Sequence, residues 1–280
     1  MQTRHIALIA GLLVAIAGAG GTLWWLYRAK PAPPAPYAEA PAAAPEAPPA
    51  SAPVADVGPK HPIEPLAAAS AVQPLPALDQ ADGVVQAALA ELIGRQGVMA
   101  FLNVDGFVRR AVVTIDNLAR PHAAPRLWPV QPSPGRLQRV VAGEAELIAP
   151  DNARRYEPFV ALVASVEPSR AAALYRRLYP LFQQAYAELG YPRGHFNDRL
   201  VEVVDHLLAA PEPTLPPAVR LTEVKGEVPS TRPWVRYEFV DQTLEALSSG
   251  QKIMVRIGTT NERRLKAWLT GFRQAIVSSR

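Results

Sequence analysis

The sequence of 280 residues contains no cysteine. Disulfide bonds, thiol catalysis and thiolate metal sites are therefore excluded, and any folded part must be stabilised by packing. Charged residues make up only 19% of the chain, and no run of five Lys or Arg residues occurs, although the net charge is +4. Because basic residues are interspersed with acidic ones, the composition argues against nucleic-acid binding.

The chain also lacks the short motifs that mark common catalytic and nucleotide sites. It contains no HExxH pattern, no phosphate-binding glycine loop and no nucleophile elbow. We therefore expect a non-enzymatic binding or scaffolding module, without a cofactor or a metal ion, that has an envelope protein as its partner. The alternative is an enzyme directed at the cell wall, or a binder of a small ligand in the periplasm.

Proline and alanine dominate one long stretch of the chain. Residues 31–80 carry few charges and almost no aromatic side chains. Such a segment buries too little apolar surface to offset the entropy of ordering it, so we expect an extended, disordered spacer. The predicted organisation is a tail (1–5), a transmembrane helix (6–27), a Pro/Ala-rich linker (28–80) and a mostly helical soluble domain (81–280).

Residues 6–27 form an apolar run without a charge, preceded by Arg4 and followed by Arg28 and Lys30. About 22 residues at about 1.5 Å each span roughly 33 Å, which is enough to cross the hydrocarbon core of a bilayer. Amphipathic rings favour the headgroup level, and three occur at the end of this run. They are Trp24, Trp25 and Tyr27.

Two alternatives to this anchor stay open. Ala17, Gly18 and Ala19 have the small size that a signal peptidase accepts, although the apolar run continues beyond them. The flanking positive charges nearly balance, so they do not fix the orientation. We expect a single-pass protein of the bacterial inner membrane with a periplasmic domain; the inverted orientation would place the domain in the cytoplasm.

Small residues recur at a spacing of four in the predicted membrane helix. They are Ala7, Gly11, Ala15 and Ala19. Such a stripe lets two helices approach closely, which predicts a homodimer within the lipid bilayer. The alternative is chance, because Ala and Gly make up most of this stretch.

Beyond residue 80 the apolar residues follow a helical period. We expect helices over 84–93 with Asp82 as a cap, 97–115 with a break at 105–106, 169–190 divided or kinked at Pro180, and 197–208. Another should follow Asp151 and carry Tyr156 and Val163, with Pro168 in the first turn of its successor.

The C-terminal part is predicted from shorter signals. Residues 235–239 alternate as a strand and can pair with 219–224 in a minor hairpin, whereas 137–148 read as a hairpin or irregular chain. A helix capped by Asp241 should continue to 257. The last helix should start at Thr259, with Glu262 completing a capping box.

Five prolines surround Trp128 in a long connection over residues 121–134. Long loops in compact domains tend to be functional or disordered, and a tryptophan favours packing. This segment is therefore expected to cover a groove.

A candidate ligand or partner surface is carried by Gln183, Tyr186, Asp205, Lys252 and Arg256. Tyrosines at 175, 179, 186 and 191 surround Gln183 and can grip a sugar or a peptide, or form a packing seam. Lys252 and Arg256, with arginines at 176 and 177, can bind an anion, or simply line exposed helix faces.

An acidic helix face offers a second type of candidate site. Asp198, Glu202 and Asp205 lie at spacings of three and four, with His206 adjacent and His195 just before the helix. Such a face can hold a divalent metal or act as acid and base. The alternative is a solvated face whose acidic groups favour the helix N-terminus.

Two segments resemble a known bacterial family. They are the stretch LYPLFQQAYAELGYP at 178–192 and the pair Gly250-Gln251-Lys252 and Arg256-Ile257-Gly258. They are similar to domain of unknown function 3014, and the likeness spans roughly residues 83–280. The resemblance implies a membrane-anchored Gram-negative envelope protein with the same anchor, stalk and domain layout, and it carries over no catalytic residue.

Overall fold

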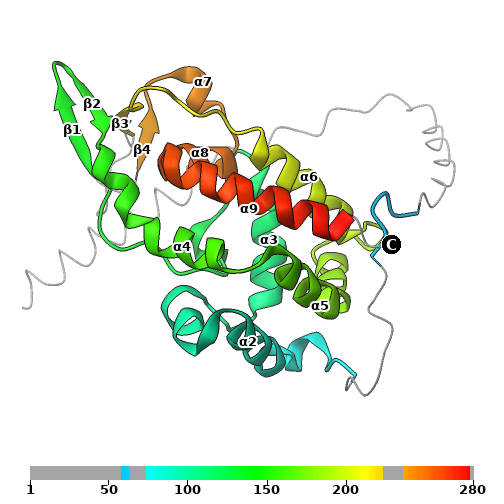
Figure 1. Cartoon of the computed structure of the whole chain (residues 1–280). Coiled ribbons are helices and arrows are strands. Elements are labelled where there is room, and N and C mark those ends of the chain that lie inside the picture. Colours follow the sequence, from blue (N-terminus) through cyan, green and yellow to red (C-terminus); the bar gives the residue numbers. More distant parts are fainter. Residues whose placement is uncertain (1–57, 64–73, 223–235, 278–280) are drawn as a thin grey trace, which may run out of the picture. The chain divides into compact units, whose positions relative to one another are not determined.

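The computed structural model describes residues 58–63, 74–222 and 236–277, which all lie in the compact unit Asp56–Arg280 (Figure 1). The predicted membrane helix, its small-residue stripe and its aromatic end lie outside the described residues, as does most of the predicted linker. Within the described ranges, no helix combines the length and the apolar character that crossing a bilayer requires.

The described fold is mainly helical, as the sequence predicts. Its α-helices are α2 (Asp82–Phe101), α3 (Phe107–Leu118), α4 (Glu157–Ser165), α5 (Pro168–Glu188), α6 (Phe196–Leu208), α7 (Gln242–Glu245), α8 (Ser249–Arg256) and α9 (Thr259–Val277). Short 3-10 turns are η1 (Leu78–Gln80), η2 (Pro125–Leu127) and η3 (Pro150–Arg155).

The main hydrophobic core forms around α5, which packs against both α3 and α9. One face of α5 buries Leu178, Leu181 and Phe182, and the ring of Phe182 stacks on Phe196 of α6 with centroids 5.6 Å apart. α9 also contacts α4 and α6, and it crosses the bundle as the red helix of Figure 1. The core therefore draws on helices from both ends of the described chain.

α5 continues through Pro180 without being divided, because apolar residues on both sides of this proline are buried in the same core, and a kink there stays a prediction. Two predicted caps are wrong. Asp82 does not cap α2; it is the first residue of this helix, and its carboxylate accepts a hydrogen bond from the Gly106 N–H (2.9 Å). Glu262 forms no capping box, because its fully buried carboxylate accepts no hydrogen bond and instead lies 3.0 Å from Lys266 Nζ.

The predicted caps at Asp241 and Pro168 are confirmed. The Asp241 carboxylate accepts hydrogen bonds from the N–H groups of Thr243 (2.7 Å) and Leu244 (3.3 Å), and Pro168 is the first residue of α5. The predicted helix after Asp241 is two helices, because Ser248 caps α8 separately through the Gln251 N–H. Each of these starts is therefore fixed by short-range chemistry.

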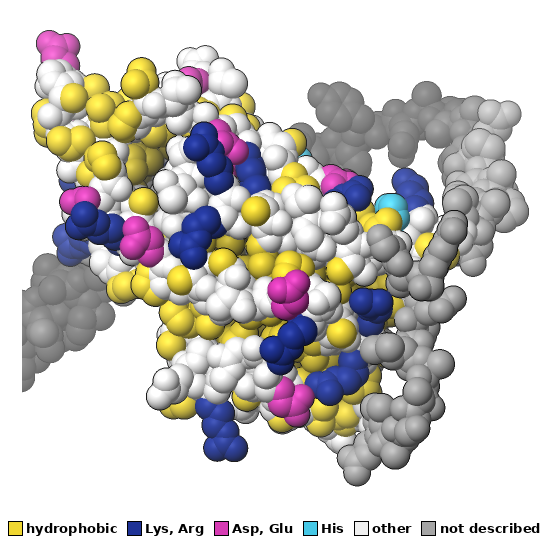
Figure 2. All heavy atoms as spheres, viewed as in Figure 1, with side chains coloured by type: hydrophobic (Ala, Val, Ile, Leu, Met, Phe, Trp, Pro, Cys, Tyr) yellow, Lys and Arg dark blue, Asp and Glu magenta, His cyan; other side chains and the backbone are white. Residues whose placement is uncertain are grey.

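The sheet is larger than the minor hairpin that the sequence predicts. Strands β1 (Arg139–Ala142), β2 (Ala145–Ile148), β3 (Ala218–Leu221) and β4 (Tyr237–Phe239) form one antiparallel sheet in that order. The pairing of β3 with β4 is confirmed, and the chain around Gly143 is a hairpin. Hydrophobic side chains gather on this hairpin in Figure 2. One of the hairpin residues, Val141, is 71% exposed.

Two parts of the predicted linker belong to the folded unit. Ile63 and Leu75 pack against the main core, and Leu78 is buried in it. η1, which contains Leu78, lies against α2 and α5.

Gly250 allows a close helix contact. A Cβ atom at this position would lie 2.5 Å from Leu207 Cδ2 and 2.8 Å from the carbonyl oxygen of Leu118. Only glycine fits without a shift of α8 away from α3 and α6. This position belongs to the Gly250-Gln251-Lys252 motif on which the family resemblance rests.

Candidate functional site

An apolar cavity lies beneath the proline-rich connection that the sequence singles out. It has a volume of about 650 Å³. Its walls come from α2, α3, α4, α8 and α9, and residues 128–134, here called the cover loop, line it as well. Lining side chains include Phe101, Ile115, Leu118, Trp128, Tyr156, Phe159, Ile253, Ile257 and Leu265. Its size and apolar walls are typical of a small-molecule site.

The cover loop is fastened along one side to the chain that follows α2. The Gln131 N–H donates to the Phe101 carbonyl (2.8 Å), and the Asn103 N–H donates to the Pro129 carbonyl (2.8 Å). Asn103 Nδ2 also donates to the carbonyls of Trp128 and Val130, both at 3.2 Å. These bonds satisfy the backbone of a segment whose prolines have no N–H of their own.

Arg155 holds the other end of the cover loop. Its Nε donates to the Pro134 carbonyl (2.9 Å) and its Nη2 to the Gly135 carbonyl (3.1 Å). Its Nη1 donates to Asn152 Oδ1 (3.0 Å) and to the Tyr156 hydroxyl (3.3 Å). The guanidinium group is therefore committed to holding the loop, and no sequence signal pointed to this role.

The Trp128 side chain on the cavity wall has an unmet hydrogen-bonding requirement. Its indole Nε1–H is buried and has no acceptor among the described residues. By contrast, the Thr114 hydroxyl on the cavity wall donates to the Leu127 carbonyl (3.2 Å). A buried unpaired donor costs free energy, so this N–H lowers the stability of the fold.

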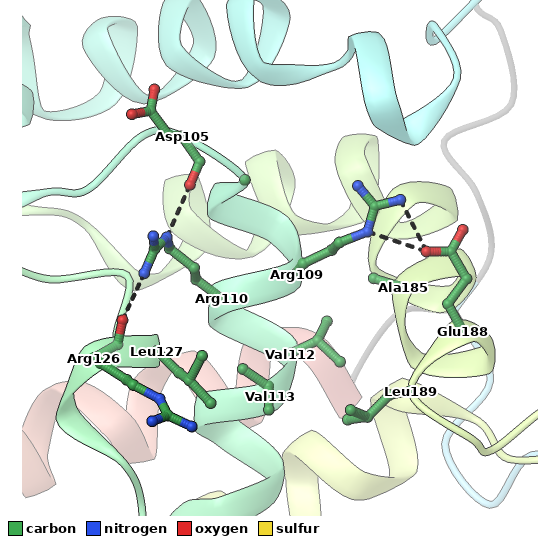
Figure 3. A pocket seen from close by; sticks show the side chains of 11 residues that line it. Asp105, Arg109, Arg110, Val112, Val113, Arg126, Leu127, Ala185, Glu188 and Leu189 are labelled. Carbon is green, nitrogen blue, oxygen red and sulfur yellow. Dashed lines mark hydrogen bonds and ion pairs between the residues drawn. The ribbon is translucent and has the colours of Figure 1, made fainter. Parts of the chain in front are cut away.

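A second hollow, of about 550 Å³, lies at the start of α3 (Figure 3). Arg109 points toward α5 and pairs with Glu188 (2.9 Å), and it also pairs with Asp79 (2.7 Å). The hydrogen bonds to Asp79 and Glu188 raise the pKa of Arg109, and the one to Asp79 has the larger effect. Arg110 donates to the carbonyls of Asp105 and Arg126, both at 2.9 Å. These contacts fasten α3 to its neighbours and leave little free charge for a ligand.

Asp116 is the centre of a buried polar cluster between α3 and α6. Its side chain is nearly inaccessible and pairs with Arg199 (2.9 Å) and Arg120 (2.8 Å). Arg120 also donates to the Tyr191 hydroxyl (2.8 Å), and the charge of Asp116 is the main cause that raises the pKa of Arg120. The carboxylate is fully compensated, so the cluster acts as a crosslink between helices.

Gln183 and Tyr186, predicted as a ligand surface, both face the connection between α5 and α6. Gln183 Nε2 donates to the Gly194 carbonyl (2.7 Å), and its Oε1 accepts from the Phe196 N–H (2.9 Å). Tyr186 is buried and stacks on Tyr191 with centroids 4.6 Å apart, and its burial raises the pKa of its hydroxyl. Their contacts are internal, and a ligand-binding role for them stays a prediction.

The other three predicted surface residues also make internal contacts. Asp205 pairs with Arg273 of α9, and Lys252 pairs with Glu245. Arg256 donates to the Tyr237 carbonyl (2.7 Å) and lies 5.0 Å from the ring centroid of Phe239. Burial lowers the pKa of Arg256, and the negative charge of Glu245 offsets part of this shift. Binding of an anion by these cations stays a prediction.

The acidic face of α6 is divided among several different partners. Asp198 accepts from the backbone N–H groups of Lys60 and His61, whereas Glu202 pairs with Arg199 (3.0 Å). His206 Nε2 lies 2.7 Å from the Ser248 hydroxyl. Over the described part of the chain, no group of three His, Asp or Glu side chains is arranged to hold a metal ion.

Comparison with known proteins gives one match. The model of the family described as "Protein of unknown function (DUF3014)" matches residues 107–273, which include α3 to most of α9 and the cover loop. No curated protein and no solved structure matches the chain. Because the family model covers more than half of the sequence, the chain belongs to the DUF3014 family.

Proposed function

We propose that the chain is a membrane-tethered envelope protein whose helical domain is a non-enzymatic binding module. Its ligand is a small, mainly apolar molecule. The single observation that supports this ligand most strongly is the 650 Å³ apolar cavity beneath the cover loop, whose walls include Trp128, Phe159 and Leu265. Apolar walls supply affinity and a few polar groups fix orientation.

The polar side chains around the cavity favour binding over catalysis. Arg155 and Tyr156 are bonded to each other, and Thr114 is bonded to a backbone carbonyl. A general acid or base needs a group that is free to exchange a proton with the substrate. Because these polar side chains are engaged in internal hydrogen bonds, they are better suited to fixing the shape of the cavity than to proton transfer.

Ligand binding is tested with a naphthalene-sulfonate dye whose emission rises in apolar surroundings. In the detergent-solubilised full chain, Ile115→Phe places extra volume in the cavity and should weaken dye binding by about tenfold. Val84→Phe is the matched control, because Val84 is 43% exposed on α2 and does not line the cavity. Equal dye affinity in both variants, with helical content unchanged, would contradict the proposed site.

The tether is supported by the apolar run at 6–27, its aromatic end and the Pro/Ala-rich stretch that follows. A C-terminal reporter enzyme that is active only outside the cytoplasm tests the orientation. Activity in cells, lost when residues 6–27 are deleted, is the expected result. A C-terminal reporter of the opposite kind, which works only in the cytoplasm, should be inactive, and its activity would reverse the proposed orientation.

A further inference from the structure

A four-residue segment from before the helical domain is held against the start of α6. The Asp198 carboxylate accepts two hydrogen bonds, from the Lys60 N–H to Oδ2 (2.9 Å) and from the His61 N–H to Oδ1 (2.7 Å). Asn197 Nδ2 donates to the His61 carbonyl (2.8 Å). Two adjacent residues of α6 therefore bind three backbone groups of a segment more than 130 residues away in the sequence.

The two residues that hold the segment are themselves held in position. Asn197 is fully buried, and its Oδ1 accepts a hydrogen bond from the Tyr175 hydroxyl (3.2 Å), which directs its amide nitrogen toward His61. Asp198 lies in the first turn of α6, where the helix dipole favours a negative charge. The positions of the Asn197 and Asp198 side chains are therefore fixed by the helical domain as well as by their contacts with the segment.

The segment is bound mainly through its main chain. The chain bends at Lys60 and His61, and the two successive N–H groups donate to the same carboxylate. Lys60 and Pro62 are exposed, whereas His61 and Ile63 are partly buried, and Ile63 packs against the main core. Recognition through main-chain groups is one of the recurring features of peptide binding. The exposed Lys60 side chain contributes no hydrogen bond to Asn197 or Asp198.

We propose that Asn197 and Asp198 form a peptide clamp whose occupant is the chain's own segment at 60–63, and that this segment is a releasable latch. Three hydrogen bonds and one apolar contact favour the bound segment, and the entropy lost on ordering the segment opposes binding. Because these two free-energy contributions are of similar size, the segment can detach locally without unfolding of the domain. On the proposed membrane tether, opening adds residues 60–73 to the span, about 43 Å at about 3.1 Å per residue.

Trypsin tests the closed state directly. Lys60 is the only Lys or Arg between Lys30 and Arg95, so a cut after it gives a diagnostic fragment. Asp198→Ala removes both acceptors of the latch and should make this cut about tenfold faster or more in the solubilised full chain. Glu202→Ala, which removes an exposed carboxylate on the same helix, should leave the cutting rate unchanged.

A proline at position 60 tests whether the clamp recognises main-chain groups of the segment. Lys60→Pro removes the N–H that donates to Asp198, whereas Lys60→Ala removes only the exposed side chain. A labelled peptide of residues 56–66 competes with the attached segment, so its apparent affinity depends on the open fraction of the clamp. It should bind the Lys60→Pro chain about tenfold more tightly than the unchanged chain, whereas the Lys60→Ala chain should match the unchanged chain.

Added Asp198→Ala should abolish binding of this peptide to the Lys60→Pro chain. The proposal is overturned if the peptide binds none of the chains, if Lys60→Pro and Lys60→Ala behave alike, or if Asp198→Ala leaves tryptic cutting unchanged. Far-UV circular dichroism of each variant separates opening of the latch from unfolding of the domain. None of these results depends on the cavity or its ligand.

Discussion

Replacing Trp128 with phenylalanine should raise or preserve the stability of the ligand-free protein. The change removes the buried indole N–H that has no acceptor, and such an orphan costs about 1–3 kcal/mol. The smaller ring also buries less apolar surface, which costs about 1 kcal/mol at about 25 cal/mol per Å². The expected change in the free energy of unfolding is therefore between zero and a gain of about 2 kcal/mol.

Trp268 provides the matched comparison. Its Nε1 donates to the Val166 carbonyl (2.8 Å), and its ring stacks on Phe272 with centroids 5.2 Å apart. Trp268→Phe loses a similar apolar area but breaks a made hydrogen bond, so it should lower the free energy of unfolding by about 1–3 kcal/mol. The main difference between the two variants is whether the removed donor had a hydrogen-bond partner.

The assay is urea unfolding of the detergent-solubilised full chain, followed by far-UV circular dichroism so that the loss of an indole does not affect the signal. A cost for Trp128→Phe as large as that for Trp268→Phe would refute the reasoning.

The same unfolding assay checks three further predictions. Gly250→Ala should destabilise the chain by about 1–3 kcal/mol, because the new Cβ would lie 2.8 Å from the Leu118 carbonyl. Gln183→Ala should cost about 2–4 kcal/mol by leaving two backbone groups unpaired, whereas Gln184→Ala, beside it, should change stability by less than about 0.5 kcal/mol. Burial raises the pKa of Glu262, so the free energy of unfolding should fall as the pH rises from about 4.5 through the folded-state pKa of this carboxyl group. Glu262→Gln should remove this pH dependence. Parallel pH profiles of the unchanged chain and the variant would contradict the prediction.

Most helices could be predicted because their signals are local. α6 and α9 follow an apolar period, and Asp241 and Pro168 mark helix starts through contacts within a few residues. The errors have non-local causes. Pro180 stays within one helix because the core holds both halves, and the β1–β2 hairpin is part of a sheet because β3 reaches it from 70 residues later.

The candidate site was predictable only in part. Prolines around Trp128 predict a segment that covers a groove, and this prediction agrees with the cavity beneath the cover loop. The cavity walls at Phe159, Ile253 and Leu265 carry no such signal, because an apolar residue on a helix reads as ordinary core wherever it lies. Gln183, predicted as part of a ligand surface, ties α5 to the start of α6 through Gly194 and Phe196, and these contacts carry no local signal in the sequence.

By itself the sequence determined the absence of cysteine chemistry, the helical character of the domain, the family likeness and the expectation of an anchor on a Pro/Ala stalk. Composition and short-range periodicity contain this information, since each depends on neighbouring residues. Only the tertiary structure decided which side chains share a cavity and that Asp198 binds the backbone at Lys60. Those contacts join residues far apart in the chain, and a local pattern cannot specify the distance between them.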